Sequence, residues 1–350
     1  MKIAVYGATG YTAGLVIEEL VRRGAEHVPV GRDLSGLRPA FRETAADLRT
    51  ASLDDPARLA AAFHGCDAVI NCVAPFVLHG EPVVRAALAA GVHYVDVTGE
   101  QYFIKRVFDV FGEDARRAGV TVMPAATDDG FCGDLLASAV AEQALGGADP
   151  AGRTGVIEEL TMAHRLVSGG PSRGTMRSAL ANRDMFASGG LGYADGRWRT
   201  GGPARRTHVA FPGDEKPSPV VKFGAPEVIM IPRHVPVRHV EGVTDAALIA
   251  ALASVTPELV ENTPPGPDEE RRRAARFTLL AEAVTGDGRR TRGVLEGSDM
   301  YGTTAVTAVE AVHRILADTP AAGVRTPGEC FPAAAVLDSL APHGVRWAVE

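Results

Sequence analysis

The sequence is poor in cysteine and in net positive charge. Its four cysteines, Cys66, Cys72, Cys132 and Cys330, are scattered through 350 residues with no CxxC pair. This spacing argues against a disulfide framework and a cysteine zinc site, so we expect a reducing, cytoplasmic location. Because 36 basic residues face 43 acidic ones, the net charge is −7 and no global positive field is available to bind nucleic acid.

Long apolar runs are also missing. No uncharged apolar run approaches the roughly 18 residues of a membrane span. The opening segment, 1–6, leads directly into a glycine-rich turn and leaves no room for the apolar region of a signal peptide. We therefore expect neither a membrane span nor a secretory leader.

The composition that remains is that of a folded globular protein. Hydrophobic residues make up 46% of the chain and charged residues 23%, which argues against extensive disorder. At about 150 residues per domain, the length predicts two domains.

The first 145 residues alternate short apolar runs with segments of helical spacing. Glycines that can act as left-handed C-terminal caps follow four of these segments, at positions 24, 65, 91 and 119. The alternation predicts an α/β fold with a doubly wound, Rossmann-type parallel sheet over residues 1–150. Its predicted strands are 2–6, 27–30, 48–52, 68–72, 94–97 and 120–123, and its predicted helices are 11–23, 56–63, 81–90, 101–117 and 131–145.

A different pattern begins after residues 146–155, which are rich in glycine, aspartate and proline. Strands are predicted at 157–167, 219–222, 227–232, 277–285 and 289–295, with 286–288 as a hairpin turn, and a helix is predicted at 303–316. We expect a second, mixed α+β domain with a largely antiparallel sheet over 151–300, and a C-terminal helix and tail, 301–350, that packs on the first domain. The second sheet could also pair across a homodimer.

A glycine-rich motif, GATGYTAG at residues 7–14, follows the first strand and opens the first helix. The spacing of Gly7, Gly10 and Ala13 permits a tight turn, approach of the backbone to a diphosphate, and close packing of helix on strand. A simple tight turn is the alternative interpretation. The predicted diphosphate-binding residues are Gly7, Thr9, Gly10, Tyr11 and Thr12.

The end of the second strand distinguishes NADP from NAD. Arg32 is suited to the 2′-phosphate of NADP, whereas a carboxylate at this place binds the 2′-hydroxyl of NAD. Asp33 stands one residue late and could instead cap the turn that follows. We therefore predict NADP(H) as the cofactor.

Two further segments are candidates for cofactor contact. Asp54 could accept a hydrogen bond from the adenine amino group, or it could cap the helix that starts at Pro56. The loop after the fourth strand is expected to pass beneath the cofactor ribose and consists of Val73, Ala74, Pro75 and Phe76.

Together these segments resemble the saccharopine dehydrogenase-like oxidoreductases, including their trans-acting enoyl reductase subgroup. The resemblance rests on GATGYTAG (7–14), Gly31-Arg32, NCVAPFVLHG (71–80), Glu81-Pro82 and YVDVTGE (94–100). It covers the first 145 residues and continues thinly through 168–170, GSDMYGT (297–303) and 323–327.

The resemblance implies an NADP-binding doubly wound domain and an inserted mixed domain over the nicotinamide. It also implies hydride transfer to or from a C=N or C=C bond, on a small or carrier-bound metabolite. Ala13-Gly14 departs from the family, which usually has glycine and then a larger residue. His79 stands where the enoyl reductase subgroup often has tyrosine, which leaves the substrate open.

Reduction of a polarised double bond needs a proton donor, and four residues are candidates. His79 follows the ribose loop, although it could also be a solvent-facing residue at a helix start. Glu100 could bind an amine or iminium, with Asp96 positioning it, but both could instead be helix caps. Asp128 lies beside Asp129, and paired carboxylates can raise one another's pKa unless the turn is solvated.

The fourth candidate, Tyr301, precedes the returning helix of the second domain. It could reach the cleft between the domains or be a packed aromatic residue. His234 and His239 lie on a strand-like segment and could also reach the cleft. Their separation of five places them on opposite faces of a strand, so they make a poor metal pair and we predict no metal.

Three rival functions follow from the same residues. A short-chain dehydrogenase needs Tyr-x-x-x-Lys, but Tyr102 and Lys105 are one residue too close. A cysteine-dependent acyl-phosphate-type reductase could use Cys132 at a helix start, although nearby acidic residues disfavour the thiolate. A non-catalytic NADP(H)-binding sensor or scaffold stays open because no acid or base is certain. The leading hypothesis is an NADPH-dependent reductase of a C=N or conjugated C=C bond.

Overall fold

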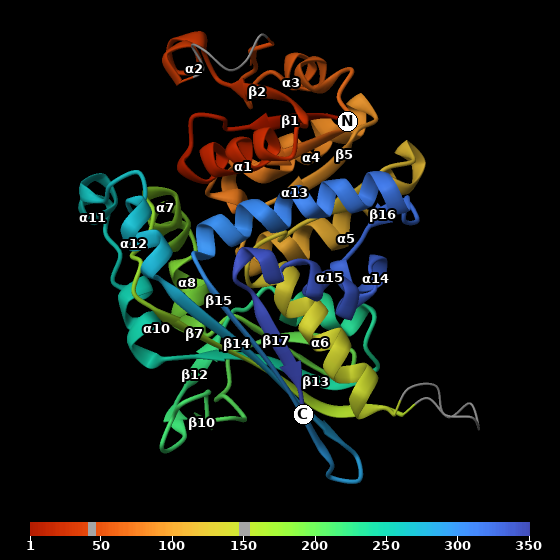
Figure 1. Ribbon diagram of the computed structural model, residues 1–350, viewed down its shortest axis with the longest axis vertical. Helices are drawn as coiled ribbons and strands as arrows, with labels where there is room; N and C mark the ends of the chain where they lie inside the picture. Colours follow the sequence, from red (N-terminus) through yellow and green to blue (C-terminus); the bar gives the residue numbers. More distant parts are fainter. Residues whose placement is uncertain (41–46, 147–154) are drawn as a thin grey trace.

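The computed structural model describes residues 1–40, 47–146 and 155–350 and contains two large β-sheets, one above the other in Figure 1. The upper sheet is formed mainly by the first third of the chain, and the lower sheet by residues after 156. The predicted boundary at 146–155 falls largely on 147–154, which lie outside the described residues.

The first sheet is parallel throughout. Within the described ranges it has seven strands in the order β16-β6-β5-β4-β1-β2-β3. Because β1 lies between β2 and β4, the strand order reverses beside β1, where dinucleotides bind in doubly wound sheets. The strands are β1 (Lys2–Tyr6), β2 (Glu26–Gly31), β3 (Arg49–Thr50), β4 (Ala68–Asn71), β5 (His93–Asp96), β6 (Thr121–Met123) and β16 (Gly323–Val324). The predicted doubly wound fold is confirmed.

Helices cover both faces of this sheet. One apolar cluster joins α1 to one face, and a second joins α3, α4 and α5 to the other. Gly24, Gly65, Gly91 and Gly119 all have positive φ, as helix-terminating glycines require. The helices of this half are α1 (Tyr11–Arg22), α2 (Leu34–Ala40), α3 (Pro56–Phe63), α4 (Phe76–Ala90), α5 (Gln101–Ala118) and α6 (Gly130–Ala144).

Helix α4 begins at Phe76, so the predicted start at Glu81 was wrong. Pro75 is its N-cap, and the backbone N–H groups of Phe76 and Val77 donate to the Glu100 carboxylate, 2.8 Å each. A carboxylate 24 residues away thus caps the added turn, and Pro82 lies inside the helix. Sequence patterns show local caps only, so this one was missed.

The second sheet is mixed. Within the same described ranges its main path is β17-β15-β14-β7-β13-β8-β9, and β12 pairs with β13. Only the β7–β13 pairing is parallel among those described. The strands are β7 (Ile157–Val167), β8 (Leu191–Ala194), β9 (Arg197–Thr200), β12 (Val221–Phe223), β13 (Val237–Thr244), β14 (Arg276–Thr285), β15 (Arg290–Ser298) and β17 (Arg346–Val349), and a separate pair is formed by β10 (His208–Val209) and β11 (Ser218–Pro219). The predicted mixed, largely antiparallel second sheet is confirmed.

The predicted strand at 227–232 was wrong. Residues Glu227–Met230 form the short helix α9, followed by a 3-10 turn at Ile231–Arg233. Because the run from Val228 to Ile231 is buried on all sides, it lacks the polar positions that distinguish a helix from a buried strand. The other helices of the second half are α7 (Arg173–Ala181), α8 (Arg183–Ser188), α10 (Ala246–Ala253), α11 (Pro257–Asn262) and α12 (Glu269–Ala274).

The C-terminal segment serves both sheets. Helix α13 (Met300–Asp318) crosses the molecule beside α1, and β16 joins the first sheet (Figure 1). Helices α14 (Pro327–Cys330) and α15 (Ala333–Ser339) then pack on α6, and β17 pairs with β15. The tail therefore ends on the second sheet, contrary to the expectation that all of 301–350 packs on the first domain.

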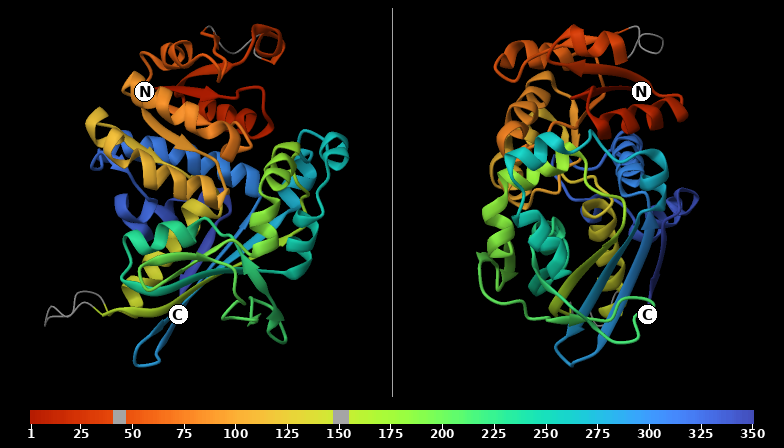
Figure 2. Two further views of the ribbon diagram at one scale, coloured as in Figure 1. Left: turned by 180° about the vertical axis from the view of Figure 1, so that it is seen from behind. Right: turned by 90° about the vertical axis from the view of Figure 1, so that its left-hand side faces the viewer.

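One apolar core connects the two halves. It runs from Val5 and Leu20 in the first sheet layer, through Val309 of α13 and Leu136 of α6, to Leu279 of the second sheet. The views in Figure 2 show α13 lying between the sheets, and α6 packs on β14 and β15 of the second sheet. Among the described residues, no helix is long and apolar enough to cross a membrane.

Candidate functional site

The glycine turn after β1 fits a diphosphate. Gly7 has φ +83°, and a Cβ there would lie 2.6 Å from Cγ2 of Val73, so only glycine fits. Gly10 is the N-cap of α1 and provides no side-chain cap, so the first amides of the helix find no side-chain acceptor among the described residues. Thr9 and Gly10 are exposed, so these amides face solvent. The arrangement is an anion site at a helix N-terminus.

Arg32 and Asp54 lie near each other, at the ends of β2 and β3. Both charges act on the Tyr6 phenol, whose pKa is raised to about 12 by burial, while Arg32 opposes and Asp54 reinforces the rise. Arg32 is exposed and forms no ion pair within the described ranges. Asp33 instead accepts hydrogen bonds from Ser35 Oγ (2.5 Å) and the Gly36 amide (3.0 Å). Asp33 therefore caps the turn, and Arg32 stays available for a phosphate.

Asp55, not Asp54, caps α3. Its carboxylate accepts a hydrogen bond from the Arg58 amide at 3.0 Å. Asp54 is exposed and contacts only Ser52, within the described residues, at 3.3 Å. The capping alternative for Asp54 was wrong, so its side chain remains a candidate for adenine contact.

The loop after β4 is held from below by Asn71. Asn71 is fully buried, accepts a hydrogen bond from the Val73 amide at 3.1 Å, and donates to Tyr94 Oη at 3.0 Å. Val73 and Ala74 are partly exposed, whereas Pro75 and Phe76 are buried. Of the four predicted ribose-loop residues, only the first two keep surface that a ligand could contact.

Asp96 and Glu100 bind backbone amides. Asp96 accepts hydrogen bonds from the amides of Ala125 (2.9 Å) and Thr98 (3.1 Å), and burial raises its pKa to about 7. Glu100 caps α4 and also accepts a hydrogen bond from Ser178 Oγ at 2.5 Å. One alternative predicted that Asp96 or Glu100 caps the helix that begins at Gln101, but neither side chain caps α5. Both carboxylates organise the loops at the carboxyl ends of the strands.

A cluster of buried titratable groups lies at the ends of β5 and β6. Asp128 accepts a hydrogen bond from Thr304 Oγ1 at 2.9 Å, and burial followed by Asp129 raises its pKa well above the ordinary range. Asp129 is the N-cap of α6. From the second half, His164 of β7 and Glu227 of α9 complete the cluster, with Nε2 and Oε1 3.0 Å apart. Asp128 is therefore buried and Asp129 partly buried, so the two do not form a fully solvated turn.

Tyr301 contacts both the start of α7 and Tyr11, the first residue of α1 after the glycine turn. Its hydroxyl accepts a hydrogen bond from the Ser172 amide at 2.7 Å and contacts Thr175 Oγ1 at 2.9 Å. Its ring lies edge-on to Tyr11, with centroids 5.2 Å apart. Tyr11 in turn donates to the Pro267 carbonyl at 2.8 Å. The predicted site residues Tyr11 and Tyr301 are thus in contact.

The three histidine candidates lie on different elements and have different surroundings. His79 is partly exposed in the first turn of α4. His234 lies after the 3-10 turn rather than on a strand, and its Nε2 is 2.7 Å from Asp134 Oδ1. His239 is on β13. Within the described ranges no group of three or more His, Cys, Asp or Glu is arranged to hold a metal ion.

The residues of two rival mechanisms are engaged elsewhere. Cys132 is fully buried, and burial together with Asp128 raises the pKa of its thiol well above the ordinary range, which disfavours a nucleophile. Lys105 pairs with Asp109 at 2.5 Å and lies over the Trp198 ring. It therefore does not act on Tyr102 as a short-chain dehydrogenase requires.

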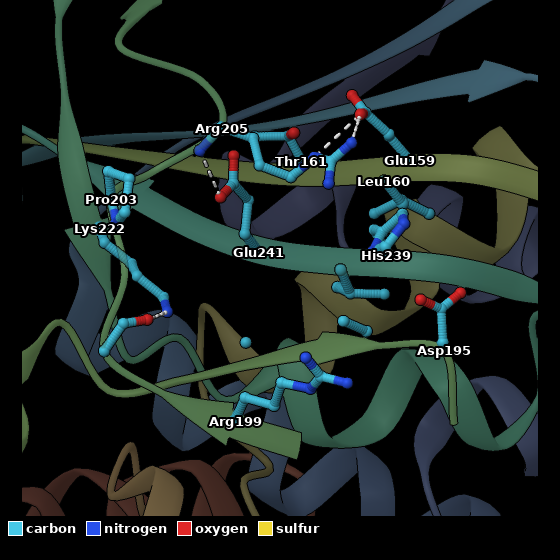
Figure 3. Close-up of a pocket in the computed structure, with 14 residues that line it drawn as sticks. Glu159, Leu160, Thr161, Asp195, Arg199, Pro203, Arg205, Lys222, His239 and Glu241 are labelled. Atoms are coloured by element: carbon cyan, nitrogen blue, oxygen red, sulfur yellow. Dashed lines mark hydrogen bonds and ion pairs between the residues drawn. The ribbon is translucent and has the colours of Figure 1, made fainter. Parts of the chain in front are cut away.

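A separate cavity of about 290 Å³ opens on the second sheet, as Figure 3 shows. It is lined by Glu159 and Thr161, which point to the face of β7 opposite His164, and by His239 of β13. Oppositely charged groups, including Arg205 and Glu159, pair with each other there. This cavity does not include the glycine turn or the buried cluster, so we do not assign it to the cofactor.

Three buried polar residues that the fold brings to this region were not identified from the sequence. His164 and Glu227 are 63 residues apart in the chain, and Glu227 was placed on a predicted strand. Gln101, predicted only as the start of α5, is fully buried and bonds to the backbone of Leu191 and Ala225. The one sequence feature that could have indicated this site is a histidine, His164, inside a predicted and largely apolar strand.

Comparison with known proteins supports the expected cofactor domain. Residues 3–123 match the family model described as the saccharopine dehydrogenase NADP binding domain. Saccharopine dehydrogenase (L-Glu forming) from Saccharomyces cerevisiae has the same fold, with a TM-score of 0.64 and 14% identity over 100% of this chain and 99% of that one.

Two curated relatives match in sequence. A lipid droplet localized protein of Caenorhabditis elegans is 33% identical over 152 residues, covering 38% of this chain and 34% of that protein. A trans-acting enoyl reductase of Mycobacterium tuberculosis is 33% identical over 140 residues, with the same coverage of 38% and 34%. The matched segments thus span about a third of each relative's length. The resemblance is confirmed as a similarity: residues 3–123 match the saccharopine dehydrogenase NADP binding domain, and the whole chain has the fold of the yeast saccharopine dehydrogenase.

Proposed function

We propose that this protein is an NADPH-dependent reductase that acts on a C=N or conjugated C=C bond of a small or carrier-bound metabolite. The observation that carries the proposal is the uncapped N-terminus of α1 over the Gly7 turn, inside a segment that matches an NADP-binding domain. The enoyl reductase name of a relative supports the same class of reaction.

The chain offers a group for each part of the cofactor. The first amides of α1, with Thr9, Gly10 and Thr12, would hold the diphosphate, and Arg32 would pair with the 2′-phosphate. The partly exposed Val73 and Ala74 would contact the ribose next to the nicotinamide. NADPH, when bound, supplies the hydride.

The four proton-donor candidates differ in their exposure and in the hydrogen bonds that their side chains already form. Glu100 and the Tyr301 hydroxyl already accept hydrogen bonds from backbone amides, which favours positioning roles for both. His79 is partly exposed and lies on the helix that follows the ribose loop. Asp128 is buried, and burial together with Asp129 raises the pKa of its carboxyl. Asp128 also accepts a hydrogen bond from Thr304 Oγ1, so the fold singles out none of the four as the proton donor.

We also propose a cytoplasmic location, a small-molecule or carrier-bound substrate, no nucleic-acid partner, and a homodimer formed through the second sheet. The four cysteines are all free, which supports a reducing compartment. The net charge of −7 supports the absence of nucleic acid. Gel filtration at several protein concentrations tests the dimer.

Loss of NADPH absorbance with a panel of cyclic imines, enones and acyl thioesters with conjugated double bonds tests the reaction. We expect oxidation of NADPH with at least one class, and formation of the saturated product by mass spectrometry. Tight NADPH binding with no turnover across the panel would instead favour the sensor, and Cys132→Ser should leave turnover intact unless the thiol is the nucleophile.

A further inference from the structure

A buried histidine–carboxylate pair connects the two halves of the molecule. His164 is 5% exposed and Glu227 is fully buried. His164 Nε2 lies 3.0 Å from Glu227 Oε1, and neither atom has a hydrogen-bond partner of good geometry among the described residues. A Cβ on Gly133 would lie 2.2 Å from Glu227 Oε1, so the first turn of α6 is shaped to admit this carboxylate.

The pair lies at the carboxyl ends of β5 and β6. Asp129, in the loop after β6, has its Oδ2 4.0 Å from the position of a Cβ on Gly99, in the loop after β5. The 2′-phosphate site is at β2 and the diphosphate site at β1, so a bound dinucleotide continues over the β4–β5–β6 side of the sheet. The histidine therefore stands on the side of the site where the nicotinamide belongs.

The face of β7 that carries His164 also leads to solvent. Leu160, Met162 and His164 share one face and are buried, whereas Leu166, the next residue on that face, is 39% exposed. Arg165 points to the opposite face and pairs with Asp214 at 2.7 Å. His164 is thus the last buried residue before an open, apolar stretch of the strand.

We propose that His164, oriented by Glu227, is the general acid of the reduction. The substrate gains the hydride at one end of its double bond and a proton from Nδ1 of His164 at the other. The imidazolium becomes a neutral imidazole that still faces Glu227 through Nε2. This proposal rests on the proposed reductase function and names the proton donor that the function requires.

The charges around His164 favour its protonated form. Burial lowers its pKa, but Glu227 of α9, and then Asp129 and Asp128 from the loop before α6, outweigh burial and raise it overall. The Phe223 ring of β12 lies edge-on at 5.3 Å and is uncharged. Glu227, whose own pKa is raised by burial, is the nearest charge.

The protonation state can be measured without any substrate. Nitrogen-15 NMR of the imidazole groups, with His164 assigned by its loss in His164→Gln, should show a protonated ring at neutral pH. Glu227→Gln should weaken proton binding at His164 roughly tenfold or more, because an opposite charge is removed. A neutral His164 at pH 7, or no change in Glu227→Gln, would overturn the proposal.

Two substrate types separate proton donation from the rest of the reaction. An enone or neutral imine needs both hydride and proton, whereas an N-alkylated iminium ion needs only the hydride. His164→Gln should lose roughly 100-fold or more in kcat on the neutral substrate and stay within several-fold on the iminium. His313→Gln, on an exposed position of α13, is the matched control.

The outcomes distinguish this proposal from the reductase function itself. If the wild-type protein binds NADPH but reduces neither substrate, the reductase function fails, and NMR still decides the charge of His164. Equal losses on both substrates, with unchanged NADPH affinity, would make His164 a structural residue and contradict the proposal. Unchanged activity on both would contradict it as well.

Discussion

At the residue scale, the two outer glycines of the motif are predicted to behave oppositely. Gly7→Ala places a Cβ 2.6 Å from Val73 at φ +83°, so it should cost about 1–3 kcal/mol in unfolding free energy and weaken NADPH binding. Gly14→Ala meets no atom within 4 Å inside α1 and should stabilise by about 0.5–1 kcal/mol. Urea unfolding and NADPH titration of both variants measure this, and equal effects would contradict it.

Asp96 makes stability depend on pH. Its folded pKa is about 7, above the unfolded value of about 3.9, so the folded state binds the extra proton between these values. The contribution of Asp96 is therefore complete at low pH and is lost as pH rises toward 7. The stability difference between the wild-type protein and Asp96→Asn should shrink or reverse from pH 5 to about pH 8 in urea unfolding. A pH-independent difference would show that burial does not perturb this carboxyl.

Individual residues were predictable where their role is local. The Gly7 turn and the Asp33 cap follow from neighbours within a few positions, and both are present. The Glu100 contacts with α4 and the His164–Glu227 pair depend on chain segments 24 and 63 residues apart. Such contacts form only through tertiary packing, and no spacing in the sequence encodes them.

At the element scale, the start of helix α3 gives different roles to two adjacent aspartates, Asp54 and Asp55. Asp55→Ala removes the N-cap and should cost about 0.5–2 kcal/mol, with the NADPH dissociation constant unchanged. Asp54→Ala, at an exposed neighbour, should leave stability within about 0.5 kcal/mol and weaken NADPH binding if its carboxylate contacts adenine. Thermal unfolding and NADPH titration of the two variants give the comparison. A stability loss in Asp54→Ala alone would contradict the assigned cap.

Element boundaries were predictable where periodicity and punctuation agree. The strand at Lys2–Tyr6 and the helix at Pro56–Phe63 have the predicted bounds, because glycine, proline and aspartate mark their ends. The errors have physical causes. Glu227–Met230 is buried on all sides and so lacks amphipathic periodicity, and the first turn of α4 is capped from outside its own sequence.

At the scale of the whole molecule, Gln101 connects the first half of the chain to the second. Its amide donates to the carbonyls of Leu191 (3.1 Å) and Ala225 (2.9 Å), and its Oε1 accepts from the Leu191 amide (2.7 Å). Gln101→Leu leaves these buried backbone groups without hydrogen-bond partners and should lower the free energy of unfolding by about 3 kcal/mol or more. Gln143→Leu, at an exposed position of α6, should change stability by less than about 0.5 kcal/mol. Similar values for both in urea unfolding would contradict the bridging role.

The proposed function depends on NADP(H) binding, with Arg32 on the 2′-phosphate and the α1 amides on the diphosphate. Calorimetric titration of the wild-type protein and of Arg32→Glu with NADPH and with NADH tests it most directly. We predict wild-type binding of NADPH, a roughly 10- to 100-fold loss of that affinity in Arg32→Glu, and little change for NADH. Equal losses for both nucleotides would contradict the assignment of Arg32 to the 2′-phosphate, and no binding of NADPH by the wild-type protein would contradict the cofactor site as a whole.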